Sequence, residues 1–223
     1  ARFGIGCIGS RAMAGRLSVE DLKSLRDQDG TVLYDEMKLR GFDPDAIASC
    51  RRKEGDVFCS LELHIEQNKV LEERDLPLGI VKAICSALNF VVTVTGQAAH
   101  AGGMPMDVRK DAYTAACEMS LALESLVREN RLSEYCTGTV GYVQLSPNAP
   151  NIIPGQVQFT VDIRDCNAAS KDALMNAVQD EFQKIAEKRD VGLRMELQNN
   201  DKPVVSHPVL MAALEQHAAA RGY

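Results

Sequence analysis

The chain has 223 residues, of which 45% are hydrophobic and 25% are charged, and its formal net charge at pH 7 is −6. This composition is that of an ordinary globular protein, and the length allows one large domain or two small ones. The acidic balance without a basic stripe argues against nucleic acid and acidic lipids as partners, and no apolar run approaches the roughly 20 residues of a membrane span.

The first part of the chain is predicted to be helical and loop-like. It opens on ARFGIGCIGS, which has neither an initial Met nor the apolar segment of a signal peptide, so we expect a chain that starts in mid-fold. A helix is predicted over residues 18–30, because Asp21 follows Ser18 at capping-box spacing. A second short helix is predicted over residues 31–42, and residues 43–57 resemble a loop.

Residues 60–68, SLELHIEQN, alternate as a strand does, with His64 between two glutamates on the polar face. A solvated strand face would explain this histidine. A metal site would explain it too, because neutral imidazole ligates zinc and neighbouring carboxylates orient the ring. A hydrolytic zinc needs three protein ligands, so His64 alone leaves both interpretations open.

Beyond residue 88 the apolar pattern switches regularly between strand and helix. The pattern predicts strands at 89–96, 139–145, 156–163 and 193–197, and helices at 109–130 and 171–190. This is the β-α-β-β-α-β order of a split βαβ, or ferredoxin-like, unit, in which two helices cover one face of an antiparallel sheet. The unit resembles an insertion, after which residues 206–223 begin a further helix.

Three polar segments lie within or between these predicted elements. His100, in GQAAHAGGMPMDVR, is either exposed in a glycine-rich loop or a hydrogen-bond donor to a substrate oxygen. The segment SPNAPNIIPG is typical of a turn between strands. For Arg164, in DIRD, the default interpretation is a surface ion pair with a neighbouring aspartate. The alternative is a binding role, because arginine is the best side chain for bidentate capture of a carboxylate.

The seven cysteines are scattered, their number is odd, and no CxxC motif occurs. This pattern argues against a disulfide framework and a thiolate zinc site, and favours reduced thiols in the cytoplasm. No GxSxG motif is present, so the nucleophile elbow of a serine hydrolase is not expected either.

Taken together, these segments resemble the hydantoinase/carbamoylase family of metal-dependent amidohydrolases. The resemblance rests on LELHIEQ followed by LGIVKAI, VTVTGQAAHAGGMPMDVRKDA, PNIIPG and VDIRD, and the opening ARFGIGCIGSRAMAG is similar to the family stretch after a metal-binding glutamate. It implies a mixed α/β and α+β fold. Residues 1–84 and 201–223 would belong to a zinc-exopeptidase-like α/β catalytic domain, and residues 85–200 to an inserted ferredoxin-like lid and dimerisation domain.

The resemblance also implies an activity. The family hydrolyses a linear amide or ureido C–N bond of a small carboxylate, such as an N-carbamoyl-L-amino acid or a ureide like allantoate. It uses two divalent ions, zinc or manganese, and forms a homodimer through the lid, and we expect a cytoplasmic protein. An aminoacylase or dipeptidase of the same architecture is the alternative enzyme, and a non-catalytic dimerisation module is the alternative for this chain alone.

Five residues match functional positions of the family. His64 matches a metal ligand, and Gln67 a polar residue near the metals and the substrate. His100 matches a lid histidine that reaches the partner subunit's active site and stabilises the oxyanion. Asn151 and Arg164 match the residues that hold the substrate's polar groups and its carboxylate, which suits an amide and a planar guanidinium.

The chain also departs from the family pattern. The early His-x-Asp pair, the Glu-Glu pair with the general base, and the last histidine ligand have no counterpart, so we expect a fragment that is inactive alone. Asn68 replaces a glycine. Gly103 replaces a threonine, which removes a hydroxyl near His100.

Overall fold

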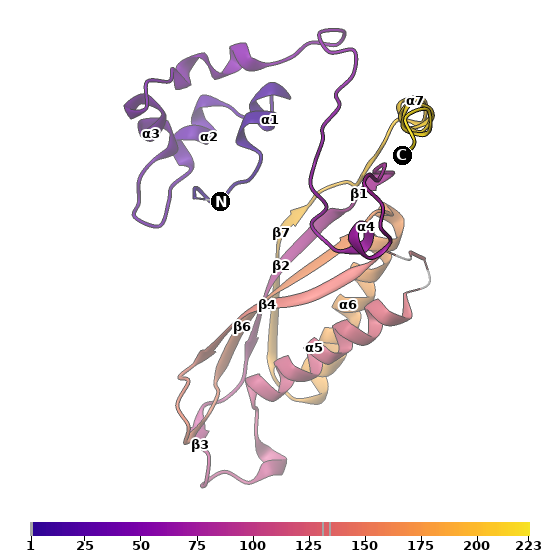
Figure 1. The fold of residues 1–223 in the computed structure, drawn as a ribbon. Coiled ribbons are helices and arrows are strands. Elements are labelled where there is room, and N and C mark those ends of the chain that lie inside the picture. The colour runs from indigo at the N-terminus through magenta and orange to yellow at the C-terminus, as the bar shows by residue number, and fades with distance from the viewer. Residues whose placement is uncertain (1, 131, 134) are drawn as a thin grey trace. The chain divides into compact units, whose positions relative to one another are not determined.

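The computed structural model describes residues 2–130, 132–133 and 135–223, which divide into two compact units. The first unit ends at Gln67 and the second begins at Asn68 (Figure 1). The limits proposed for a catalytic and a lid domain, at residues 84 and 200, stay a prediction. Within the described ranges, no helix is both long and apolar enough to cross a membrane.

The first unit is a small helical cluster. It contains α1 Ile8–Met13, α2 Val19–Ser24, α3 Leu33–Leu39 and the 3-10 helix η1 Pro44–Cys50. The predicted capping box is confirmed: the Ser18 hydroxyl accepts the Asp21 amide at 3.1 Å, and the Asp21 carboxylate accepts the Ser18 amide at 2.8 Å. Leu22 is fully buried in the apolar core that these elements share.

The helix predicted over residues 18–30 is shorter than expected and ends at Ser24. A turn follows, in which one oxygen of the Asp27 carboxylate accepts the amides of Asp29 at 3.1 Å and Thr31 at 2.8 Å. An aspartate that bonds nearby amides offers the backbone an alternative to the helix. This local competition ends the helix before its expected boundary.

The strand predicted over residues 60–68 is wrong in this structure, since residues 60–66 adopt no regular element. Their apolar side chains are exposed, Leu63 at 91%. A strand is stabilised by pairing with a neighbour, and none of the described strands pairs with this segment. Without a neighbouring strand among the described residues, the alternation of polar and apolar residues does not produce a strand here. The short helix α4, Val70–Glu73, follows.

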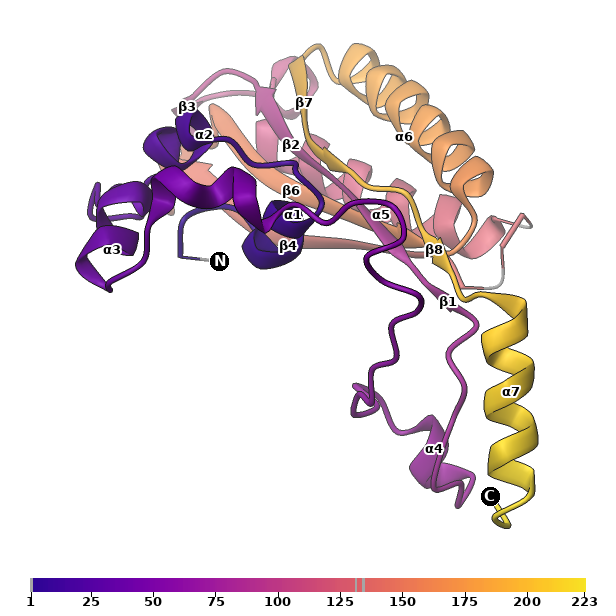
Figure 2. The same cartoon turned by 90° about the horizontal axis from the view of Figure 1, so that it is seen from above.

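The second unit confirms the predicted β-α-β-β-α-β order. Its elements are β2 Ser86–Thr95, α5 Ala112–Glu129, β4 Thr137–Ser146, β6 Gln156–Asp165, α6 Ala168–Lys188 and β7 Gly192–Asn200. The strands form one antiparallel sheet in the order β4-β6-β2-β7. Both helices cover the same face of this sheet (Figure 2).

Alternate residues of the two central strands form the core of the second unit. Residues 88, 90, 92 and 94 of β2 and residues 157, 159, 161 and 163 of β6 are buried against the helices. Phe159 meets Phe182 of α6 at a ring-centroid distance of 6.1 Å. The intervening residues, among them Thr160, Asp162 and Arg164, therefore lie on the face that the helices leave open.

The chain enters and leaves this sheet through a two-stranded ribbon that was not predicted. It consists of β1 Ala83–Ile84 and β8 Val204–Val205, paired antiparallel. The helix α7, Pro208–Ala219, comes after it. Two adjacent connections are what an inserted unit requires, so the ribbon agrees with the insertion inferred from the pattern.

The expectation that all cysteines are reduced thiols is wrong for one pair, because Cys85 and Cys166 form a disulfide. The register of β2 and β6 sets Ser86 opposite Asp165, and the two cysteines are the next residues along. They are separated by 81 residues in sequence, so spacing gave no signal of the pairing. The other five cysteines are free.

Candidate functional site

The two predicted residues near the metal, His64 and Gln67, lie at the end of the first unit. Both side chains are exposed. The His64 Nδ1 atom is 2.6 Å from the carbonyl oxygen of Ile65. Among the described residues, no three histidine, cysteine, aspartate or glutamate side chains gather where they could hold a metal ion. The residues present do not form a metal centre by themselves, and the ligand role of His64 stays a prediction.

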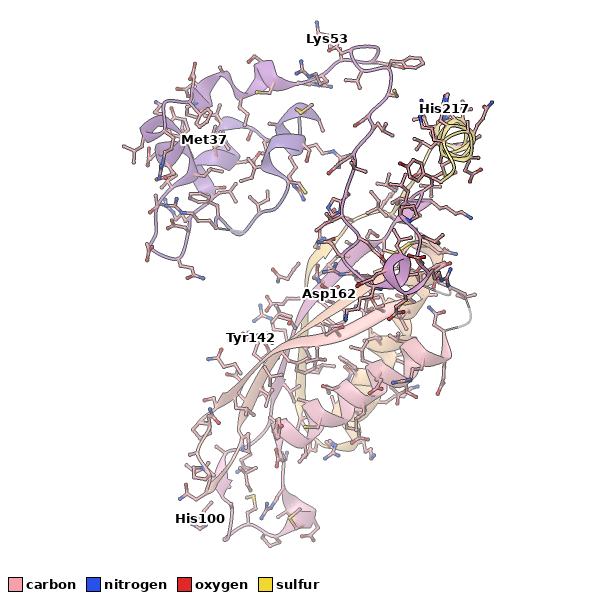
Figure 3. All side chains as sticks on the ribbon, in the orientation of Figure 1. Met37, Lys53, His100, Tyr142, Asp162 and His217 are labelled. Carbon is pink, nitrogen blue, oxygen red and sulfur yellow. A yellow bond between two sulfur atoms is a disulfide. The ribbon has the colours of Figure 1, made fainter. Side chains whose placement is uncertain are left out.

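His100 and Asn151 are brought together, although 51 positions separate them in the sequence. The short strand β3, Ala99–His100, pairs with β5, Ile152–Ile153, so that His100 lies opposite Ile152. The Ala101 amide then donates to the carbonyl oxygen of Asn151 at 2.9 Å. The two polar segments thus form one tip of the second unit, where Figure 3 shows His100.

Close backbone contacts build this tip. The Gly96 amide donates to the Gly155 carbonyl at 2.8 Å, and the Gln97 amide to the Lys110 carbonyl at 2.8 Å. A Cβ atom at Gly96 would lie 2.0 Å from the Lys110 carbonyl oxygen, and one at Gly155 would lie 3.0 Å from Ala98. Glycine is needed at these two positions because backbones pass each other too closely for a side chain.

The His100 side chain is exposed, and its Nδ1 atom lies 3.1 Å from the Gly102 amide nitrogen. A Cβ atom at Gly103 would lie 3.7 Å from Nδ1 and 3.8 Å from the His100 Cβ atom, which are ordinary contact distances. A Cβ atom at position 103 would therefore fit beside His100 without displacing it.

Arg164 forms the ion pair that was its default interpretation. Its Nε and Nη2 atoms each lie 3.0 Å from an oxygen of Asp162, two residues earlier on the same strand. The Arg164 hydrogen bonds lower the pKa of Asp162, and the same bonds raise the pKa of Arg164. The arginine side chain is still 61% exposed, so the pair orients the guanidinium without enclosing it.

A shallow hollow of about 560 Å³ lies beside Arg164 on the open face of the sheet. Its polar lining includes residues that sequence reasoning did not single out, namely Asn89, Thr137, Thr139, Thr160 and Gln198. Polar residues at alternate strand positions were the available signal, but a solvated sheet face gives the same pattern.

The structure does not bring Arg164 near His100 and Asn151. Ile152 and Ile153 precede the start of β6 at Gln156, whereas Arg164 lies near the end of that strand. Eight residues of extended chain span about 26 Å. Figure 3 agrees, with His100 at the tip and Asp162, the partner of Arg164, toward the other end of the sheet.

Comparison with known proteins gives three results. The family described as Peptidase dimerisation domain matches residues 83–190. An N-carbamoyl-L-amino acid amidohydrolase of Geobacillus stearothermophilus is 40% identical over 223 residues, which is 100% of this chain and 54% of that protein. A ureidoglycolate hydrolase of Arabidopsis thaliana is 34% identical, over 97% of this chain and 47% of that protein.

A solved structure gives a similar result. It is an amidase of the hydantoinase/carbamoylase family from Burkholderia multivorans, with a TM-score of 0.85 and 30% identity, over 100% of this chain and 53% of that one. The chain spans about half the length of the curated relatives it matches.

Proposed function

Because the chain belongs to the hydantoinase/carbamoylase family, we propose that it is part of an amidohydrolase of ureido or amide bonds. The substrate would be a small carboxylate with a linear C–N bond, such as an N-carbamoyl-L-amino acid or a ureide like allantoate. The activities stated in the names of the two relatives, an N-carbamoyl-L-amino acid amidohydrolase and a ureidoglycolate hydrolase, support this class of substrate. The observation that carries the proposal is Arg164, which Asp162 orients beside a hollow on the open sheet face.

Arg164 would bind the substrate carboxylate. A guanidinium has five N–H donors, and Asp162 is bonded to Nε and Nη2. Among the described residues no other partner of Arg164 is found, so the edge formed by Nη1 and the second Nη2 hydrogen can take another carboxylate. Hydroxyl groups in the hollow, such as that of Thr160, would satisfy other polar atoms of the substrate.

His100 and Asn151 would act on the same substrate from a second copy of the chain. One lid cannot reach a small molecule with both ends, since about 26 Å of strand separates them. The family name of residues 83–190 supports a homodimer through this unit. In a two-fold dimer, the same surfaces meet twice, so two sites could each combine Arg164 of one copy with His100 and Asn151 of the other. There His100 would hydrogen-bond the carbonyl oxygen as it gains negative charge.

The proposed activity belongs to a longer protein, because the relatives are about twice the length of this chain. The resemblance implies divalent ions, a general base and further metal ligands. Residues outside this chain would provide the base and those ligands and would bind the ions. His64 and Gln67 would contribute to that centre. The proposed location is the cytoplasm, where disulfides are rare, so the Cys85–Cys166 bond weighs against it.

The test uses a hybrid enzyme in which this chain replaces the corresponding part of the Geobacillus stearothermophilus relative. It would be assayed on N-carbamoyl amino acids, ureides, N-acyl amino acids and dipeptides; preference for the last two would favour the aminoacylase or dipeptidase alternative. Arg164→Ala should raise KM by about 100-fold, because a bidentate arginine–carboxylate pair is worth about 3 kcal/mol. Arg128→Ala, at an exposed arginine of α5 paired with Glu124, is the control and should leave KM unchanged. An unchanged KM in Arg164→Ala would reject the carboxylate assignment.

A second candidate function is favoured for the chain alone. The described residues form no group of three metal-ligating side chains, so by itself the chain would serve only in dimerisation. Elemental mass spectrometry after zinc or manganese loading and desalting should find far less than one ion per chain. One or two retained ions would show that a site assembles without further residues.

A further inference from the structure

The segment that follows His100 folds back onto the imidazole ring. The Gly102 amide donates a hydrogen bond to Nδ1 at 3.1 Å. A backbone amide can only donate, so the Nδ1 atom in this contact carries a lone pair and not a proton. The neutral ring then has its proton on Nε2. Gly102 also packs closely, because a Cβ atom there would lie 3.3 Å from Cε1 of the ring.

Arg109 holds this segment in place. Its Nη2 atom donates to the Ala101 carbonyl at 2.6 Å and to the Met104 carbonyl at 2.8 Å, and its Nε atom donates to Met104 at 3.0 Å. The guanidinium is half-buried, whereas the residues between Met104 and Arg109 are exposed. Hydrogen bonds from a charged donor are about twice as strong as neutral ones. The three Arg109 hydrogen bonds therefore fix the conformation of a loop that has little apolar core of its own.

We propose that Arg109 is a positioning residue for His100, which it serves by fixing the turn at residues 101–104. The fixed turn aims the Gly102 amide at Nδ1, and that contact keeps neutral His100 in the Nε2–H form with its N–H exposed. An N–H donor is what an oxyanion requires. The role of His100 in catalysis rests on the proposed function. The position of the proton on Nε2 and the effect of Arg109 on the turn do not.

The experiment is nuclear magnetic resonance of the 223-residue chain labelled with ¹⁵N, in solution alkaline enough to keep imidazole neutral. Long-range ¹H–¹⁵N correlations report which ring nitrogen carries the proton. One ordinary hydrogen bond shifts an equilibrium by about three- to tenfold, so the ratio of Nε2–H to Nδ1–H should exceed that of free histidine by this factor. A ratio equal to that of free histidine, or shifted toward Nδ1–H, would overturn the proposal without any variant.

Two variants test the role of Arg109. Arg109→Gln removes the charge and the fork, and it should return the His100 ratio toward that of free histidine and increase the mobility of the Gly102 amide. Arg109→Lys keeps the charge and should retain part of the shift. Arg128→Gln, at an exposed arginine of α5, should change neither readout. The amide resonances of β2 and β6 report whether each variant is folded.

A folded Arg109→Gln variant with an unchanged His100 ratio would overturn the positioning role. These measurements use no substrate, so they separate the two proposals. If the hybrid enzyme is inactive while the ring is held as Nε2–H, the proposed function fails and the positioning role stands. If the hybrid is active and His100 has the tautomer ratio of free histidine, the proposed function stands and the positioning role fails.

Discussion

At the scale of single residues, Lys171 is the least expected feature of the structure. This lysine of α6 is 1% exposed. Its ammonium group donates to the Ser86 hydroxyl at 2.7 Å and to the Asp201 carbonyl. Ser86 begins β2 and Asp201 follows β7, so one side chain ties the entering and the leaving strand to a helix. A buried lysine is rare unless it is paired, and no sequence pattern marked this one.

Replacing Lys171 by methionine tests this tie. Lys171→Met keeps the length of the side chain but leaves the Ser86 hydroxyl and the Asp201 carbonyl without their donor. The free energy of unfolding should fall by about 2 kcal/mol, because buried groups that lose a charged partner cost about this much. Urea unfolding followed by the amide resonances of β2 and β6 would measure it.

The control is Lys184→Met on the same helix, where the lysine is 70% exposed and pairs with Glu181. That change should cost less than about 0.5 kcal/mol. Equal stabilities of the two variants would show that Lys171 does not tie the strands.

At the scale of elements, the sequence predicted what depends on local periodicity. The strands and helices of the second unit were found because alternate residues such as Phe159 and Val161 face a covered side, while Thr160 and Asp162 do not. Residues 60–66 show the same alternation, but no described strand pairs with them. Periodicity predicts which face would be buried and not whether a partner is present.

The same distinction separates the candidate-site residues that the sequence marked from the contacts that it missed. His100 and Arg164 were marked by residue type and neighbouring glycines or acids. The pairing of β3 with β5, the Cys85–Cys166 bond and the contact of Arg109 with Ala101 depend on contacts between distant or loop residues. The first two contacts are set by the register of paired strands and the third by the path of a loop, and none of them leaves a local pattern in the sequence.

The tip that carries His100 yields a sharp prediction at this scale. Gly96→Ala would place a Cβ atom 2.0 Å from the Lys110 carbonyl oxygen, and real Cβ atoms do not approach backbone this closely. The backbone must move, so we expect a loss of about 3 kcal/mol in stability and shifted resonances for Ala99, His100 and Ile152.

Gly141→Ala is the matched control for this change. A Cβ atom at Gly141 would meet its nearest neighbour, the Thr160 hydroxyl, at 4.0 Å. This variant of β4 should remain within about 0.5 kcal/mol of the parent chain. A Gly96→Ala variant as stable as Gly141→Ala would mean that the two backbones at the tip are not held so close.

At the scale of the whole molecule, the second unit carries candidate polar groups at both ends of its sheet. Arg164 is held by Asp162 near one end of β6, and His100 and Asn151 form the tip beyond the other. Under the proposed function, neither end is a complete site by itself. A two-fold pair of such units would make two sites if each tip reached the arginine of its partner.

Subunit complementation tests this claim most directly. In the hybrid enzyme, assayed with substrate well below the KM of the parent, Arg164→Ala and His100→Ala should each be nearly inactive alone. Co-expressed in equal amounts, they should recover about a quarter of the parent activity, because half of the dimers are mixed and each mixed dimer has one intact site. Activity no higher than that of the two variants measured separately would contradict a site shared between two copies.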